Sequence, residues 1–422
     1  MRRLTLAPSR TQGLSTLVTL LGLFLLTALA TAYANRHLLI EHRMARVMQD
    51  DARAQAAAAW GAERALGLLN AGAIDDRCQW PRGGDAGTPA AERWLRRPAT
   101  GPWTLLPANA AMVCDAIADE RWDCRCAGPG SSVPLRDTPP QRTQSLKVEL
   151  QPMADHPDVL RLLVLGCAQG SAECRTDLPQ GSIARQQARH SPLQQHVGWL
   201  PALRQLPASA LMVQGAVDLG DGLLLSNEDP STQGLALHAG GAVTGSTAGL
   251  VGPPGSLPAE RWLGRDPSLQ DLGDDGLRRR LFGRRACAGE TPPGLHRIAC
   301  ATPCTAEAVT SAWRRGHRWV QVDGDLELDT PVDWGDASRP LLLSVEGHLR
   351  WSGGGRFVGA LLGGGDAQLG GQAWQTEGAL VVSGGLRADR QGRVRHDRAV
   401  LLRLQREAGS FVRLPGGRWP AA

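Results

Sequence analysis

The sequence is almost without lysine and is poor in tyrosine and phenylalanine. Lys147 is its only lysine, so the other 45 of the 46 basic residues are arginine. One tyrosine and four phenylalanines stand against thirteen tryptophans. No single binding surface would remove lysine from a whole chain, so we attribute this bias to codon usage. The formal net charge of +5 over 422 residues does not by itself indicate a nucleic-acid-binding protein.

The chain also lacks the sequence motifs of common enzymes. HExxH and GxSxG are absent, and the ten histidines are scattered without a pair at helical spacing beside a carboxylate. Cys124-Arg-Cys126 lacks the paired CxxC or histidine cluster that a zinc site needs. We therefore predict that the protein is not an enzyme and that it has no catalytic residue, metal or cofactor.

Charge is missing from the stretch between Arg10 and Arg36. Its apolar part, Leu14 to Tyr33, is about 20 residues long, which is enough to cross a bilayer as a helix. The three arginines that precede it predict a cytoplasmic N-terminus, with the rest of the chain in the periplasm. We expect a single-pass inner-membrane protein, whose membrane helix includes Leu14, Leu20, Phe24, Leu29 and Tyr33.

The same stretch permits a second interpretation. Its end, Ala32-Tyr33-Ala34, has the small-x-small form of a signal-peptidase site, and cleavage there would release a soluble periplasmic protein. However, residues 36–70 contain no proline and are rich in alanine, so they predict a continuation of the same helix. A signal peptide has no use for a helix that continues past its cleavage site. We therefore expect one membrane-spanning and amphipathic helix over residues 14–70, after a cytoplasmic leader at 1–13.

Nine cysteines fit an oxidising compartment, and their odd number leaves at least one unpaired within the chain. Cys167 and Cys174 bracket a short loop and predict a disulfide. We expect Cys124 and Cys126 to form disulfides with Cys78 and Cys114. The remaining group predicts one pair and one free thiol among Cys287, Cys300 and Cys304.

The remainder of the chain indicates an α+β protein with a β-rich head. Residues 71–200 predict a cysteine-containing, loop-rich α+β region, and residues 201–422 a glycine-rich β domain. Units of the form apolar-x-apolar-x-Gly recur without a fixed period, which favours stacked short strands over a regular repeat array. We expect a solenoid-like part at 340–405 and a helix at Thr305 to Arg315.

Arg278, Arg279 and Arg280 form the sharpest charged cluster. Exposed arginines could contact the phosphates of a nucleic acid. Asp271, Asp274 and Asp275 precede the cluster at helical spacing, and pairing with them or simple solvation is the favoured interpretation.

The N-terminal segment resembles the PilX-type pilus assembly proteins of Gram-negative bacteria. The similarity is carried by Gly13-x-Ser-Thr-Leu, Ala34-Asn35-Arg36, Glu41-x-Arg43 and the alanine-rich tract near Glu63 and Leu66, and it continues in Trp122-Asp-Cys-Arg-Cys126, Gly166-Cys167 and Leu237-His-Ala-Gly-Gly241. The resemblance implies a minor pilin or pilus-assembly subunit of a type IV pilus. Its implied partners are other pilins, minor pilins and the inner-membrane pilus assembly machinery.

One departure from the pilin pattern concerns processing. Prepilins are cut after a glycine, here Gly13, so that the chain would start at Leu14, and the fifth residue after the cut is usually glutamate. That position is Val18. The glutamate neutralises the amine of a neighbouring subunit in the apolar filament core, where an unpaired charge is costly. A subunit with valine there is best tolerated at the pilus tip on the cell surface, so we expect an initiating or capping role.

Two alternatives stay open at this point. The chain could be a soluble periplasmic β-rich protein, either carbohydrate-binding or a β-helix enzyme. It could also be a membrane-anchored periplasmic scaffold that never enters a filament, in which case Gly13 is not cut.

Overall fold

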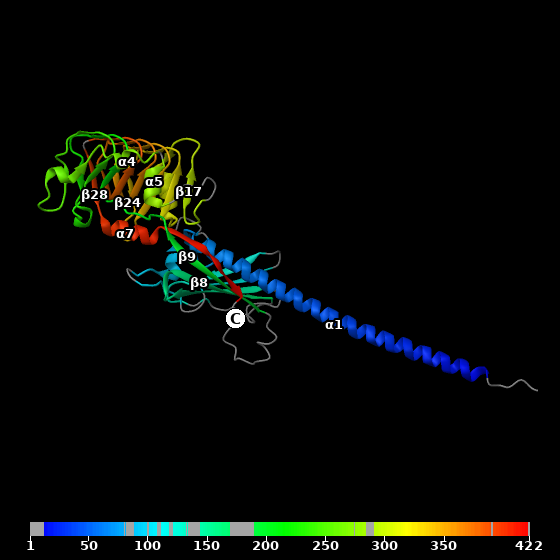
Figure 1. Cartoon of the computed structure of the whole chain (residues 1–422). Coiled ribbons are helices and arrows are strands. Elements are labelled where there is room, and N and C mark those ends of the chain that lie inside the picture. Colours follow the sequence, from blue (N-terminus) through cyan, green and yellow to red (C-terminus); the bar gives the residue numbers. More distant parts are fainter. Residues whose placement is uncertain are drawn as a thin grey trace, which may run out of the picture.

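A computed structural model of the chain combines one very long helix with two β-rich bodies (Figure 1). The structure describes residues 12–79, 81, 88–98, 101–107, 111–117, 121–131, 133, 144–168, 190–273, 275–283, 291–389 and 391–420. The expected α+β class is confirmed: a long apolar N-terminal helix precedes a β-rich body. The leader at residues 1–13 lies mostly outside the described residues.

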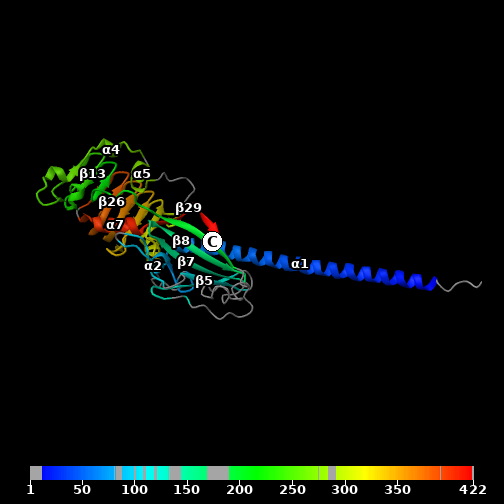
Figure 2. The same cartoon turned by 60° about the horizontal axis from the view of Figure 1, so that its bottom comes forward.

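Helix α1 (Gln12–Leu69) has 58 residues and is therefore about 87 Å long. No proline interrupts it, and the alanines of its second half have the highest helix propensity of any residue. Its first part projects away from both β bodies, and its last part packs against one of them (Figures 1 and 2). The Asn70 side chain, just past its end, accepts from the backbone N–H of Phe411 at 2.8 Å and donates to its carbonyl at 2.9 Å.

The body in contact with α1 is a six-stranded antiparallel sheet. Helix α1 crosses β7, β8 and β9. In β8, residues 160, 162 and 164 are buried and alternate with partly exposed ones, which is the period of two of a sheet covered on one face. From edge to edge the strands are β29 (Gly409–Pro420), β9 (His190–Pro201), β8 (His156–Cys167), β7 (Ser145–Met153), β5 (Met112–Ala116) and β6 (Trp122–Cys126).

Short elements complete this body between α1 and β5. They contribute Trp94, which is fully buried, to the core that α1 and the sheet share. They are β1 (Ala73–Ile74), β2 (Thr88–Pro89), α2 (Ala90–Trp94), β3 (Leu95–Arg96) and β4 (Thr104–Leu105).

The second body is a solenoid of parallel strands in which each full coil has three sides. One side belongs to a seven-stranded sheet, and the other two belong to a twelve-stranded sheet. The seven strands are β11 (Val217–Leu219), β14 (Val243–Gly245), β18 (Cys304–Thr305), β20 (Leu326–Leu328), β23 (Leu349–Trp351), β25 (Ala367–Leu369) and β27 (Leu386–Ala388). The twelve are β10 (Leu211–Val213), β12 (Leu224–Ser226), β13 (Leu237–Ala239), β15 (Leu250–Val251), β16 (Trp262–Leu263), β17 (His296–Ala299), β19 (Trp319–Asp323), β21 (Val332–Trp334), β22 (Leu341–Val345), β24 (Gly355–Gly363), β26 (Trp374–Val382) and β28 (Gly392–His396).

Strands β24 and β26 each turn a corner and so serve two sides of the solenoid. The first half of β24 pairs with β21 and its second half with β22. The corners are Gly359 (φ +144°) and Gly378 (φ +123°), which lie one above the other in the ladder. A side chain there would meet the backbone of the neighbouring coil, so these two turns require glycine.

The solenoid core is built from ladders of like residues. Leu343, Leu361, Leu380, Leu211 and Leu237 stack in register on five successive coils. All five are buried. Stacking of this kind gives each coil an apolar floor and an apolar roof, so the core is continuous along the solenoid axis.

The coils are not stacked in chain order. The coil of β10, β11 and β12 pairs on one side with β13, β14 and β15, and on the other with the last coil, β26, β27 and β28. The first coil of the chain, β10 to β12, therefore lies in the middle of the solenoid. The next strands, β13 to β16, form one end, the chain then crosses to the opposite end at β17, and the later coils fill the space back to the first coil. The crossing segment contains α4 (Pro267–Gln270) and α5 (Gly276–Phe282); η1 (Pro230–Thr232), η2 (Pro258–Arg261), α6 (Ala306–Arg314) and α7 (Arg398–Glu407) lie elsewhere along the solenoid.

Two expectations from the sequence need correction. The solenoid is not confined to residues 340–405, because its strands run from Leu211 to His396. Residues 201–422 are not a single β domain either, because β29 returns to the antiparallel sheet and pairs with β9. The solenoid is thus inserted between two neighbouring strands of the first body. The helix expected at Thr305 to Arg315 is present as α6.

Candidate functional site

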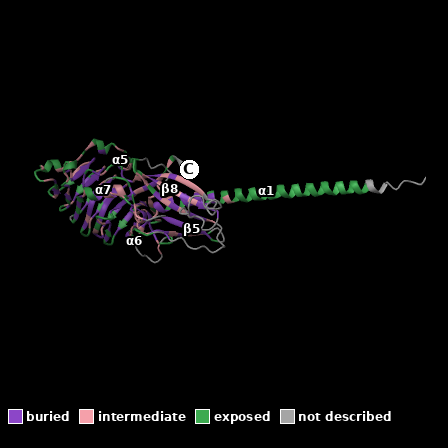
Figure 3. Ribbon diagram, turned by 90° about the horizontal axis from the view of Figure 1, so that it is seen from below, coloured by how far each residue is buried: buried purple, intermediate pink, exposed green. Residues whose placement is uncertain are grey.

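The first part of α1 exposes its apolar side chains along their full circumference. Every described residue from Thr16 to Gln49 is exposed, and Phe24 reaches 77%. Figure 3 shows this half as a bare helix beyond the buried core. Leu20, Leu29 and Tyr33 of the predicted membrane helix are among these residues, whereas the side chain of Leu14 is outside the described set.

The length and composition of this segment fit a single-pass membrane anchor. The candidate span begins at Thr16, and its most apolar window has a mean hydropathy of 2.1 with no residue buried. A soluble monomer rarely exposes so large a contiguous apolar surface. The segment therefore needs an apolar environment that the described part of the chain does not provide.

The few polar side chains of this segment satisfy their hydrogen bonds within the helix. Thr19 donates to the carbonyl of Thr16, Thr27 to Phe24, and Thr31 to both Thr27 and Ala28, at 2.8–2.9 Å. Bonds from threonine to the preceding turn remove the cost of placing a hydroxyl in hydrocarbon. This arrangement suits a helix whose surroundings offer no water.

Charged residues begin at Arg36, yet the helix remains partly apolar beyond that point. Leu38, Leu39 and Ile40 are all exposed, and since consecutive helical residues are about 100° apart, they cover more than half of the circumference. Met44, Val47 and Met48 continue the exposed apolar surface. We call residues 36–48 the juxtamembrane segment; its apolar side chains rest on neither β body.

The last part of α1 is built to lie close to the antiparallel sheet. Its buried face is mostly alanine: Ala54, Ala57, Ala58, Ala62 and Ala65. Opposite them, Gly166 on β8 approaches so closely that a Cβ there would lie 2.1 Å from the carbonyl oxygen of Ala54. Small side chains on both elements therefore set the distance between the helix and the sheet.

The processing residues lie in the first two turns of α1. The helix begins at Gln12, so Gly13 and Leu14 are part of its first turn, and that turn carries no acidic residue. Val18 is 63% exposed and presents an apolar side chain where prepilins usually have a carboxylate. Cleavage after Gly13 stays a prediction.

The described cysteines are joined by disulfides in both β bodies. Cys78 bonds Cys126, and Cys114 bonds Cys124, as the sequence grouped them. In the solenoid Cys300 bonds Cys304. Cys167 is disulfide-bonded as well, while Cys174 and Cys287 lie outside the described residues.

The arginine cluster lies on α5, against the side of the solenoid. Arg278 pairs with Glu346 at 2.7 Å, and among the described residues neither Asp271 nor Asp275 pairs with it; Asp274 lies outside the described residues. Arg279 and Arg280 are exposed. The cluster is therefore partly neutralised by a residue distant in sequence. Among the described residues no group of three His, Cys, Asp or Glu side chains is placed to hold a metal ion.

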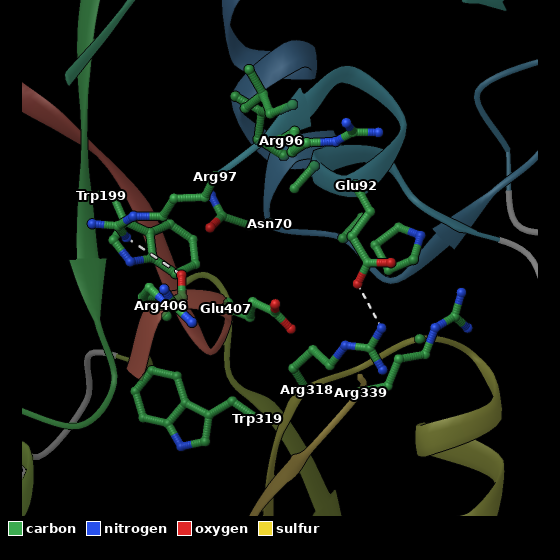
Figure 4. A pocket seen from close by; sticks show the side chains of 18 of the residues that line it. Asn70, Glu92, Arg96, Arg97, Trp199, Arg318, Trp319, Arg339, Arg406 and Glu407 are labelled. Atoms are coloured by element: carbon green, nitrogen blue, oxygen red, sulfur yellow. Dashed lines mark hydrogen bonds and ion pairs between the residues drawn. The ribbon is translucent and has the colours of Figure 1, made fainter. Parts of the chain in front are cut away.

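A pocket of about 450 Å³ opens where the two β bodies meet, and we call it the junction pocket (Figure 4). Its walls come from the end of α1, α2, β3 and β9 on one side, and from β19, the loop at Ser338 and the end of α7 on the other. Arg318 bonds Glu92 across it at 2.6 Å. Arg97 lies over the rings of Trp103 and Trp199, 5.1 and 5.8 Å from their centroids.

Three titratable groups of the junction pocket have pKa values shifted by their surroundings, and burial lowers that of Arg97. Burial raises the pKa of Glu407 to about 7, and the nearby charge of Glu92 acts in the same direction. Burial lowers the pKa of His317 to about 3, helped by its neighbour His296, whose ring stacks on it at 4.0 Å. Glu407 and His317 therefore both favour their neutral forms compared with the same groups in water. Local sequence patterns do not predict this pocket, because its walls come from segments far apart in the chain.

The chain thus combines a long apolar N-terminal helix, which fits a single-pass membrane anchor, with a β-rich body that contains an inserted solenoid. No protein-family model matches the sequence, and no curated protein matches it. Among solved structures the chain is similar to the competence-associated pilin ComZ from Thermus thermophilus, at 10% identity and a TM-score of 0.19, over 87% of this chain and 96% of that chain. A TM-score this low does not establish a shared fold, so no conclusion is drawn from it.

Proposed function

We propose that the protein is a minor-pilin-like subunit that initiates, caps or supports a type IV pilus, in a structural and not a catalytic role. The observation that carries the proposal is the exposed apolar surface of α1, which extends through the juxtamembrane segment. A plain anchor needs an apolar surface only within the bilayer. A subunit that packs its helix among other helices needs one further along, where Leu38, Leu39 and Ile40 lie exposed.

The architecture behind the helix supports the same proposal. The second half of α1 forms part of the core of the antiparallel body, so the helix and this sheet form a single unit. Such a unit can be lifted from the membrane into a filament without a flexible joint. In an assembled pilus the partners of α1 would be the helices of other pilins, and before assembly the inner-membrane machinery.

Release of a soluble protein after Ala34 is less consistent with these features. Helix α1 continues through Ala34 and Asn35 without a break. Cleavage there would leave six exposed apolar side chains near the new N-terminus of a soluble protein: Leu38, Leu39, Ile40, Met44, Val47 and Met48. A permanent anchor that never enters a filament remains the second candidate, and the fate of Gly13 separates it from the first.

Mass spectrometry of the mature N-terminus in membrane and sheared-pilus fractions tests the proposal. A chain in the pilus fraction that starts at Leu14 supports a processed subunit. A start at Asn35 would contradict the proposal in favour of a soluble protein, and an intact N-terminus found only in membranes would reduce the role to an anchor.

The tip role has its own test in Val18→Glu, with Val18→Leu as the matched control. If the missing carboxylate confines the subunit to the tip, Val18→Glu restores the charge partner for a neighbouring amine and spreads the subunit along the filament. Val18→Leu keeps the position apolar and should leave the distribution unchanged. Immunogold labelling of sheared pili distinguishes the two patterns, and terminal labelling of both variants would contradict the tip role.

A further inference from the structure

The junction pocket has the size and composition of a small-molecule site. Its volume of about 450 Å³ lies within the range of roughly 300–1,000 Å³ that ligand pockets occupy. It lies between two separately built bodies, which is a common position for such sites. Apolar surface from Leu69 and Leu95 lies beside the charged groups, so the pocket offers both kinds of contact.

Positive charge exceeds negative charge in this pocket. Five arginines line it against two glutamates, and they are Arg96, Arg97, Arg318, Arg339 and Arg406. Two of them have carboxylate partners: Arg318 pairs with Glu92, and Arg97 with Asp158. Within the described part of the chain, no carboxylate lies within ion-pair distance of the other three. The pocket therefore attracts a negative group.

Several buried donors in the pocket lack an acceptor. Arg318 is only 9% exposed, and although its Nη2 donates to Glu92, its Nε has no hydrogen-bond partner among the described residues. The indole nitrogens of Trp103 and Trp199 are in the same state. A buried donor without an acceptor is costly, and the cost is greatest for a charged one. These nitrogens have almost no surface open to the pocket, so a ligand with oxygen acceptors removes this cost only if the side chains rotate toward it.

The arrangement also suggests where a carboxylate would lie. Figure 4 shows Arg318 and Arg339 on the same side of the pocket, with Glu407 between them and Arg406. A guanidinium presents a planar fork of donors that matches a carboxylate. Glu407 and Ser338 also line the pocket and carry polar side chains suited to hydroxyl groups.

We propose that the junction pocket binds an acidic sugar, with its carboxylate against Arg318 and Arg339 and its hydroxyl groups toward the opposite wall. A bare anion would fill only a small part of the volume and would leave the remaining polar and apolar surface unused. A polyhydroxylated ring uses donors, acceptors and apolar surface together. This proposal does not depend on the role of α1 in a pilus.

Calorimetric titration of the full-length protein in detergent with D-glucuronate tests the proposal. D-glucose, which has the same ring without the carboxylate, is the ligand control. The double variant Arg339→Gln and Arg406→Gln removes two arginines without touching the Arg318–Glu92 pair. Arg387→Gln, on the seven-stranded face of the solenoid, is the matched protein control. We expect glucuronate to bind, glucose to bind at least about tenfold more weakly, and the double variant to lose about tenfold or more in affinity while Arg387→Gln retains it.

Each other outcome overturns part or all of the proposal. Absence of glucuronate binding removes it altogether, and equal binding by wild type and the double variant moves the site elsewhere. Equal binding of glucose removes the role of the carboxylate. If a dipeptide with a free C-terminal carboxylate binds and glucuronate does not, the pocket recognises peptide ends and not sugars. Because Arg339 is exposed and Arg406 lies at the end of α7, circular dichroism of the double variant should match wild type.

Discussion

The two β bodies of this protein obtain their cores in different ways. The antiparallel sheet buries one face, and its core depends on the alanine face of α1 together with the disulfides Cys78–Cys126 and Cys114–Cys124. The solenoid core is enclosed by the solenoid's own strands. In the stacked ladders each coil packs its apolar side chains against those of the coils on either side. The sheet therefore cannot be separated from the helix, whereas the solenoid is complete without it.

This difference explains how one chain can carry both bodies. The chain leaves the antiparallel sheet after β9, forms the solenoid, and re-enters the sheet as β29. Because β9 and β29 pair with each other, they hold the two ends of the solenoid close together. An insertion at such a site can vary in length without disturbing the helix–sheet unit. In a filament subunit, the helix–sheet unit would serve assembly, and the inserted solenoid would present the outer surface.

Removal of a large core side chain from the solenoid should have the largest effect and should remain local. Trp351 is buried among the ladders, and its Nε1 donates to the carbonyl of Gly354 at 2.9 Å. We expect Trp351→Ala to lower the stability of the solenoid by about 4 kcal/mol, from lost burial and the cavity left behind. Hydrogen exchange followed by mass spectrometry should show lost protection in solenoid peptides but not in β7 and β8. Equal loss in both bodies would contradict their independence, and Arg350→Ala, an exposed change on the same strand, is the control.

The antiparallel body should respond most to loss of its longer disulfide. Cys78 and Cys126 are 48 residues apart, while Cys300 and Cys304 in the solenoid are only 4 apart. In the chain-entropy account a longer loop gives the greater stabilisation, so we expect the double alanine variant of Cys78 and Cys126 to lose about 4 kcal/mol. The corresponding solenoid variant should lose about 2 kcal/mol or less. Urea unfolding of the two variants measures this, and a larger loss for the short loop would reverse the comparison.

A smaller effect is expected where the helix meets the sheet. Gly166→Val places side-chain atoms where Ala54 and Ala58 of α1 already lie, so the helix must move away. We expect a loss of about 2 kcal/mol from overpacking, confined to the antiparallel body. Gly67→Ala is the opposite control: nothing lies within 4 Å of its added methyl group, and it should stabilise α1 by up to about 1 kcal/mol. Thermal unfolding in detergent compares them, and an unchanged midpoint for Gly166→Val would show that the helix is not held closely.

Much of the helix and part of the disulfide pattern could be predicted from local sequence. The absence of proline, the uncharged stretch and the tract of alanines favour a helix through local interactions. The sequence therefore predicts α1 without any knowledge of the fold. The grouping of Cys78, Cys114, Cys124 and Cys126 was also visible. Which cysteine pairs with which depended on the register between β5 and β6.

The solenoid and the junction pocket depended on contacts that local sequence does not contain. In the leucine ladder the spacing is 18 positions from Leu343 to Leu361 but 26 from Leu211 to Leu237, so no fixed period could be recognised. The return of β29 required knowledge of where β9 ends. The pocket unites Arg97, Arg318 and Arg406, which only the meeting of the two bodies brings together.

The smallest expected effect lies at the boundary between the two bodies and depends on pH. Burial raises the pKa of Glu407 to about 7 in the folded protein, against 4.5 for the group in water. Between these two values the folded state binds more protons than the unfolded state, so stability falls as pH rises through this window and levels off above about 7. The glutamine of Glu407→Gln cannot ionise, so the free energy of unfolding of this variant does not fall in this pH window. Wild type and variant should therefore be equally stable at pH 4, with the variant ahead at pH 8.

The size of that difference distinguishes a tight boundary from an open one. The Glu407 side chain is 38% exposed, and solvent screening should limit the gain at pH 8 to about 1 kcal/mol or less. Urea unfolding at the two pH values measures it, with Glu327→Gln on the open face of the solenoid as the control for loss of one carboxylate. A gain for Glu407→Gln that is the same at both pH values would mean that the change acts through packing and not through the proton. In that case the contact between the two bodies would not exclude water from Glu407. The solenoid would then be independent of the antiparallel sheet at their contact as well as in its core.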